Sequence, residues 1–254
     1  MVPADLLVAG DSAPITAAFS AAIQRAVAGC TPGSVIIQVR EKDLDGRLLL
    51  ALVRAAQPFA PVAVNDRLDV ALAANAWAVH LPERGLSVAD ARALAAAVAP
   101  SLVIGASRHA GTIDAELAAA DHAAADHAAA DLAAADLAAA DLAAADLAAA
   151  NHAAADLAAA DLIQLGPIWP TPSKPDALTL GEAALADLAR RGLARRAGRA
   201  RRATLVAVGG IDSAERAERA AASGADAVAI IRAAWTGDSL APYVAAVTAG
   251  RARR

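Results

Sequence analysis

Eight short apolar runs, separated by helix-like stretches, constrain the fold of this chain more than any other feature. The runs lie at residues 5–10, 34–40, 61–66, 76–82, 101–107, 160–167, 204–210 and 227–232. Each is nearly continuous in Val, Ile, Leu and Ala, a pattern typical of parallel strands buried on both faces. Such strands alternating with helices across residues 1–254 predict one α/β domain, a (β/α)8 TIM barrel.

Two of the intervening stretches carry helix boundary signals. The stretch "SVADARALAAAVA" (87–99) begins with Ser87, a suitable N-cap, and places Asp90 at the third helical position. The stretch "SAERAERAAASG" (213–224) ends on Gly224, a residue that suits the position just past a helix. Both stretches are therefore predicted to be helices between neighbouring strands.

The connection before the sixth apolar run is a low-complexity insertion. Residues 112–160 repeat the pentad Ala-Asp-Leu-Ala-Ala, whereas a crossover needs only about a dozen residues. Alanine favours a long helix or helical hairpin, but a five-residue period gives an α-helix no fixed apolar stripe. The unit also resembles the pentapeptide repeat, whose members form β-helices, and disorder is a third alternative. We expect the domain to fold without this insertion.

Three histidines stand at leucine positions of the pentad: His122, His127 and His152. The five-residue spacing of the first two differs from the i, i+4 pair of a helical metal site. We interpret them as drifted repeat positions and not as metal ligands.

Charge is unevenly distributed along the chain. Nine acidic residues lie in 116–161, and the rest of the chain carries 23 basic and 18 acidic residues, which suits small anionic ligands. Seven arginines cluster in "RRGLARRAGRARR" (190–202). Since no aromatic residues are interleaved, this cluster indicates a solvated helix face and no nucleic-acid partner.

Cysteine usage and the apolar runs indicate a cellular compartment. The single cysteine, Cys30, cannot form an internal disulfide, which favours a reducing environment. The N-terminus lacks the basic segment of a signal peptide, and no apolar run reaches membrane-spanning length. We expect a cytoplasmic protein without a membrane partner. The sequence leaves open whether the protein forms a homo-oligomer.

Residues capable of chemistry gather where the predicted strands end, the rim that carries the active site of such barrels. They include Lys42 and Lys174, the only lysines among 23 basic residues. A lysine ammonium is compact and mobile, unlike a guanidinium, which gives a reason for lysine at these two positions. Arg40 and Lys42 alternate with Glu41 and so point the same way from one strand. Two converging cations suit a phosphate or pyrophosphate, and surface charge at a strand edge is the alternative. The Gly209–Gly210 turn ends the seventh run, at the usual phosphate site of these barrels.

Two rim residues have alternative roles. Asp66 is a candidate ligand for Mg²⁺, which takes one or two carboxylates beside substrate phosphates, or a cap for the helix that begins at Arg67. His109 is a candidate general acid or base, or an ordinary loop histidine.

Five ordered motifs resemble the thiamine phosphate synthase/TenI family. They are "QVREKD", "VNDRLDVALAANAWAVHL", "IGASRH", "ADLIQLGPIWPTPSK" and "VAVGGI". The family implies a TIM barrel and two reactions. Its synthases join hydroxymethylpyrimidine pyrophosphate to a thiazole phosphate, release pyrophosphate and use Mg²⁺. Its TenI-type tautomerases shift a proton within a thiazole carboxylate phosphate and need no metal.

The resemblance also implies roles for individual residues. The pyrimidine pyrophosphate would be held by Gln38, Arg40, Lys42 and Asn65. Asp66 would bind magnesium, and Ser107 and Lys174 would contact the leaving pyrophosphate. The thiazole phosphate would be held by Thr171, Ser173, Gly209, Gly210, Ile231 and Arg232. His109 matches the histidine of the tautomerases, and with Ser107 and Lys174 it makes up the predicted catalytic set.

This chain departs from the synthase pattern at two places, and the first resembles the TenI branch. Synthases read H-L-G-Q-E-D-L after the fourth strand, with the Asp as second metal ligand, whereas this chain reads "HLPERGL". Gly85 therefore stands at the ligand position, with Glu83 nearby, and Arg232 replaces a phosphate-binding Ser. We expect tautomerase-like proton transfer on a thiazole phosphate without a cofactor. A Mg²⁺-dependent thiamine phosphate synthase and a non-catalytic binding barrel are the alternatives.

Overall fold

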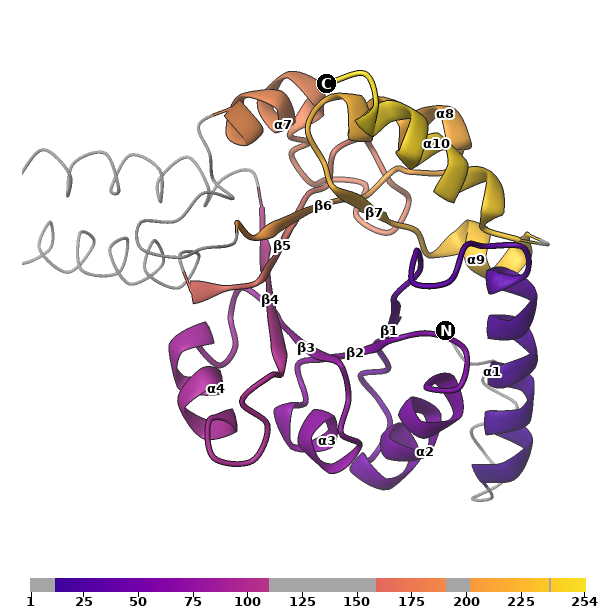
Figure 1. Ribbon diagram of the computed structural model, residues 1–254, viewed down its shortest axis with the longest axis vertical. Coiled ribbons are helices and arrows are strands. Elements are labelled where there is room, and N and C mark those ends of the chain that lie inside the picture. Colours follow the sequence, from indigo (N-terminus) through magenta and orange to yellow (C-terminus); the bar gives the residue numbers. More distant parts are fainter. Residues whose placement is uncertain (1–11, 110–158, 191–201, 238) are drawn as a thin grey trace, which may run out of the picture.

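The computed structural model describes residues 12–109, 159–190, 202–237 and 239–254, and within them seven parallel strands form one curled sheet (Figure 1). In sheet order, which is also chain order, they are β1 (Ile37–Val39), β2 (Val62–Asn65), β3 (Ala78–Leu81), β4 (Val103–Arg108), β5 (Leu162–Leu165), β6 (Thr204–Val208) and β7 (Ala227–Ala229). The predicted parallel α/β architecture is confirmed, and each strand falls within one of the predicted runs except β4, which extends one residue past its run to Arg108. The run 5–10, expected as a further strand, lies outside the described residues.

Helices surround the curled sheet on its outer side (Figure 1). They are α1 (Ser12–Val27), α2 (Gly46–Ala56), α3 (Leu68–Ala73), α4 (Val88–Ala95), α7 (Gly181–Arg190), α8 (Ala214–Ala222), α9 (Arg232–Thr236) and α10 (Ala241–Arg251). The predicted N-cap of α4 is confirmed, because the Ser87 side chain accepts a hydrogen bond from the Asp90 amide at 3.0 Å. Gly224 has a φ of 120° just after α8, as its predicted position past the helix requires.

The main core lies between the strands and the helices that cover them. Ile104 of β4 and Ile163 and Leu165 of β5 are fully buried. Each such side chain contributes about 1.5–3 kcal/mol through burial. Because residues alternate along a strand, the neighbours of these residues face the opposite side of the sheet, toward the interior around which it curls.

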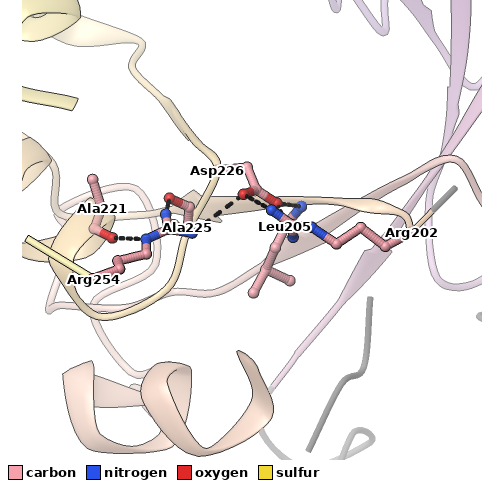
Figure 2. Close-up of polar contacts among 6 residues, drawn as sticks. All are labelled: Arg202, Leu205, Ala221, Ala225, Asp226 and Arg254. Carbon is pink, nitrogen blue, oxygen red and sulfur yellow. Dashed lines mark hydrogen bonds and ion pairs between the residues drawn. The ribbon is translucent and has the colours of Figure 1, made fainter. Parts of the chain in front are cut away.

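Two aspartates clamp neighbouring strands at their amino ends. Asp226, just before β7, accepts hydrogen bonds from the Leu205 amide of β6 at 3.0 Å and from Arg202 at 2.7 Å (Figure 2). Arg254 approaches the same carboxylate at 3.3 Å and donates to the Ala221 carbonyl at 2.8 Å. Burial acts to raise the pKa of Asp226, but the bonds from Arg202, Leu205 and Arg254 outweigh it and lower the pKa.

The second clamp repeats this arrangement between β4 and β5. Asp161, just before β5, accepts from the Ile104 amide of β4 at 2.9 Å and from Arg92 at 2.8 Å. In both clamps a carboxylate joins a backbone amide of the preceding strand to a guanidinium, which fixes the stagger of the two strands.

Several predictions fall outside the described residues. They concern residues 112–158 of the pentad insertion, with His122, His127 and His152, and residues 191–201 of the arginine cluster. Within the described part of the chain, the helices lack the combination of length and apolarity that crossing a membrane requires.

Candidate active site

A chain of three carboxamides spans the interior of the curled sheet near the carboxyl ends of the strands. Gln164 of β5 donates to the Gln38 side-chain oxygen of β1 at 2.7 Å, and Gln38 donates to Asn65 of β2 at 3.3 Å. Strands β1 and β5 are four places apart in the sheet, so these side chains meet across the interior. The structure thus brings the predicted residues Gln38 and Asn65 together. Gln164 was missed, although a polar residue within an apolar run was a usable signal.

A buried histidine lies beside this chain. His80 of β3 is 2 % exposed, and its Nε2 lies 2.7 Å from the hydroxyl of Ser107, a predicted site residue on β4. Burial, with a smaller effect of the Arg40 charge, lowers the pKa of His80 to about 4. His80 is therefore neutral near pH 7 and suited to positioning Ser107 rather than to proton transfer.

The close packing of His80 requires glycine on the neighbouring strand. A Cβ on Gly105 of β4 would lie 2.7 Å from His80 Nδ1, closer than nonbonded atoms approach. The small residue in the "IGASRH" motif thus makes room for the imidazole ring.

The rim carries an ordered array of three ionisable side chains. His109 Nδ1 lies 2.6 Å from Glu83 Oε2, and His109 Nε2 lies 2.8 Å from the Lys174 ammonium. An ammonium only donates hydrogen bonds, so His109 Nε2 accepts and Nδ1 carries the proton that faces Glu83. A carboxylate that fixes the tautomer of a histidine is the arrangement of a general base. His109 and Lys174 were predicted site residues, whereas Glu83 was noted only for its proximity.

The loops after β5 and β6 pack tightly against each other. Gly209 and Gly210 have φ values of 92° and 71°, and a Cβ on either would lie 2.6 Å from Pro167 or Trp169. Only glycine meets both demands. Thr171 and Lys174, in the same loop as Trp169, pair through their backbones, with the Lys174 amide 3.0 Å from the Thr171 carbonyl.

The remaining predicted residues follow strands at the same rim. Arg40 and Lys42 come after β1, Ser173 lies in the loop after β5, and Ile231 and Arg232 come after β7; all are exposed. Since all seven strands run in parallel, their carboxyl ends share one edge of the sheet. The expectation that residues from separate strands share one rim agrees with this topology.

Asp66 lies close to position 85, where the family resemblance predicts a second carboxylate in synthases. A Cβ on Gly85 would lie 3.4 Å from Asp66 Oδ1, so a side chain there would reach the aspartate. Glu83 instead contacts His109. The N-cap of α3 is Arg67, without a side-chain capping bond, so Asp66 does not have the alternative role of a helix cap.

The described residues contain no group of three or more His, Cys, Asp or Glu side chains placed to hold a metal ion. Mg²⁺ often takes only one or two carboxylates beside phosphate oxygens and water, so the role of Asp66 stays a prediction.

A family model described as "Thiamine monophosphate synthase" matches residues 6–135 and 137–234. The chain belongs to this family. The match spans all the described strands and every predicted site residue, so the family resemblance of the five motifs is confirmed.

Curated relatives agree with the family. The chain is 43% identical over 94 residues to a putative thiamine-phosphate synthase of Geobacter sulfurreducens, covering 35% of this chain and 41% of the relative. It is 39% identical over 94 residues to the thiamine-phosphate synthase of Xanthobacter autotrophicus, covering 35% of this chain and 42% of the relative. These matches thus span less than half the length of the relatives.

A solved structure shows the same fold. Thiamine phosphate pyrophosphorylase from Pyrococcus furiosus superposes with a TM-score of 0.55 at 22% sequence identity, covering 94% of this chain and 88% of the other. At that identity the likeness concerns the fold and supports the barrel architecture.

Proposed function

We propose that this member of the family is an enzyme of thiamine biosynthesis that transfers a proton within a thiazole phosphate, as TenI-type tautomerases do. The observation that carries the proposal is the Glu83–His109–Lys174 array, in which a carboxylate orients a histidine at the rim. In the reaction, His109 Nε2 takes a proton from a carbon of the heterocycle and returns it to another position. Glu83 stabilises the imidazolium that exists between the two steps.

The surrounding residues supply an anion-binding rim. The Gly209 and Gly210 amides, Thr171, Ser173 and the start of α9 at Ile231 and Arg232 would hold the substrate phosphate. Lys174 donates to His109 Nε2 in the free protein. A bound anion attracts this ammonium and frees Nε2 to act as the base.

A second candidate is thiamine phosphate synthase, favoured by the names of the curated relatives. In that reaction Gln38, Arg40, Lys42 and Asn65 would hold the pyrimidine pyrophosphate, and Ser107 and Lys174 would contact the leaving group. Asp66, as the one carboxylate at its position, would share a magnesium ion with pyrophosphate oxygens. The glycine at position 85 weighs against this candidate, because the second carboxylate of the synthase pattern is missing.

Two substitutions, assayed in both reactions, separate the candidates. His109→Asn is expected to abolish thiazole isomerisation, and Asp66→Asn to leave it unchanged. Asparagine is preferred to alanine at position 66 because the residue has a φ of 67°, which asparagine tolerates. Loss of a magnesium-dependent condensation in Asp66→Asn, with isomerisation absent from the wild type, would instead establish the synthase.

A further inference from the structure

We propose that Gln164 restricts the site to a single phosphorylated heterocycle by holding Gln38 across the interior of the barrel. The inference rests on the proposed function, since it explains why a thiazole phosphate would be bound and a pyrimidine pyrophosphate rejected. It assigns a specificity-determining role to a residue for which the sequence predicted none.

The contact between the two glutamines joins distant parts of the chain. Gln164 Nε2 lies 2.7 Å from Gln38 Oε1, and the residues are 126 positions apart. Their strands, β5 and β1, are separated by β2, β3 and β4 in the sheet. Both side chains must therefore extend inward, and together they occupy the space between the two sides.

The position of this contact along the strands places it within the candidate site. Gln164 pairs with Ser107 in the register of β4 and β5, and Gln38 bonds to Asn65 at the end of β2. Asn65 and Ser107 are the residues that the synthase candidate assigns to the pyrimidine pyrophosphate and to the leaving group. The bridge thus lies among these residues and not in a deeper layer of the barrel.

The Gln164–Gln38 contact engages the carboxamide of Gln38, which the synthase candidate assigns to the pyrimidine pyrophosphate. The Gln38 oxygen already accepts from Gln164, and its nitrogen already donates to Asn65. The Gln38 amide keeps one lone pair and one N–H. The exclusion therefore depends on the space that Gln164 occupies in front of Gln38, from which a pyrimidine would displace it. Losing one neutral hydrogen bond weakens binding by about two- to twelve-fold, and the volume of the displaced side chain adds to this.

The test is calorimetric titration of the full chain with hydroxymethylpyrimidine pyrophosphate and, separately, with thiazole phosphate. The wild type is expected to bind the pyrimidine pyrophosphate weakly, and Gln164→Ala to bind it about ten-fold more tightly. Affinity for thiazole phosphate should change by less than about two-fold, because the proposed phosphate ligands lie on the loops.

A matched control comes from the same strand. Leu162 shares the interior-facing side of β5 with Gln164, one residue pair closer to the amino end, and its neighbour in β4 is Gly105. Leu162→Ala opens the interior away from Gln38 and should not improve binding of the pyrimidine pyrophosphate. Circular dichroism checks that each variant is folded, and Gln164→Ser replaces Gln164→Ala if the latter is not.

Two outcomes would overturn the inference: equal affinity of wild type and Gln164→Ala for the pyrimidine pyrophosphate, or an equal gain in Leu162→Ala. A failure of the proposed function is seen elsewhere, in a wild type that neither binds nor isomerises thiazole phosphate. The two failures are therefore distinguishable.

Discussion

The two ends of the strands use charged groups in different ways. At the amino ends, Asp161 and Asp226 are each saturated by a backbone amide and a guanidinium, so their charges serve the fold. At the carboxyl ends, Lys174 is exposed and bonds to an imidazole rather than to a carboxylate. The difference indicates that amino-end substitutions act mainly on stability and carboxyl-end substitutions mainly on ligand binding and chemistry.

The largest expected effect tests the carboxyl end. Removing the base by His109→Asn should lower the rate of thiazole isomerisation by about 100- to 10,000-fold, the usual contribution of general base catalysis. His109 is only partly buried, so the free energy of unfolding should change by less than about 1 kcal/mol. Steady-state kinetics and urea denaturation measure the two quantities. A stable variant with full activity would show that His109 is not the base.

The next largest effect is the contribution of His80 to the pH dependence of stability. It is an exception to the division between the two ends, because His80 lies near the carboxyl ends of the strands. His80 has a pKa of about 4 in the folded protein against 6.5 when unfolded, so the unfolded chain binds more protons between these values. The contribution of His80 to the free energy of unfolding should be fully present above pH 6.5. The free energy should then fall by up to about 3 kcal/mol as the pH falls to 4. In His80→Gln this part of the pH dependence should vanish. An unchanged pH profile of urea denaturation in the variant would contradict the assignment.

A smaller effect tests the amino end. Asp226→Asn leaves Arg202 and Arg254 without their carboxylate and should reduce the free energy of unfolding by about 2 kcal/mol, with kcat unchanged. The pKa of Asp226 is lowered, so its contribution is present above the pKa of an unfolded aspartate and is lost as the pH falls through the folded value. The loss should therefore be seen at pH 7 and shrink in acid. Asp69→Ala, at an exposed pair with Arg67, is the control and should cost less than about 1 kcal/mol.

The smallest effect separates the parts of this clamp. Arg254→Ala removes the bonds to the Ala221 and Ala225 carbonyls but leaves the Arg202–Asp226 pair (Figure 2). A loss of about 1 kcal/mol is expected in thermal unfolding. A loss equal to that of Asp226→Asn would show that Arg254, and not Arg202, is the main partner.

The fold could be predicted because its signals are local. Each of the seven described strands lies in an apolar run, β4 extending one residue past the end of its run. Ser87 and Gly224 mark helix ends through contacts with residues at most three positions away. Such signals depend on the chemistry of neighbouring residues and need no knowledge of the tertiary structure.

The site was only partly predictable, because its decisive contacts are not local. The strand count placed Gln38, Asn65 and Ser107 at one rim, and the family motifs supplied roles for them. The bond from Gln164 to Gln38 joins opposite sides of the curled sheet, and neither sequence neighbourhood indicates this pairing. The orientation of Glu83 toward His109 likewise depends on where two separate loops lie.

The packing of the Gly209–Gly210 turn against Pro167 and Trp169 has a consequence for protein engineering. Two loops in van der Waals contact, one with the proposed phosphate amides and the other with Lys174, form a single mechanical unit. Transplanting only one of these loops from another family member would leave mismatched surfaces where the two loops contact each other. A chimaera that exchanges both loops together is expected to keep the spacing between the proposed phosphate-binding amides and the Lys174 ammonium.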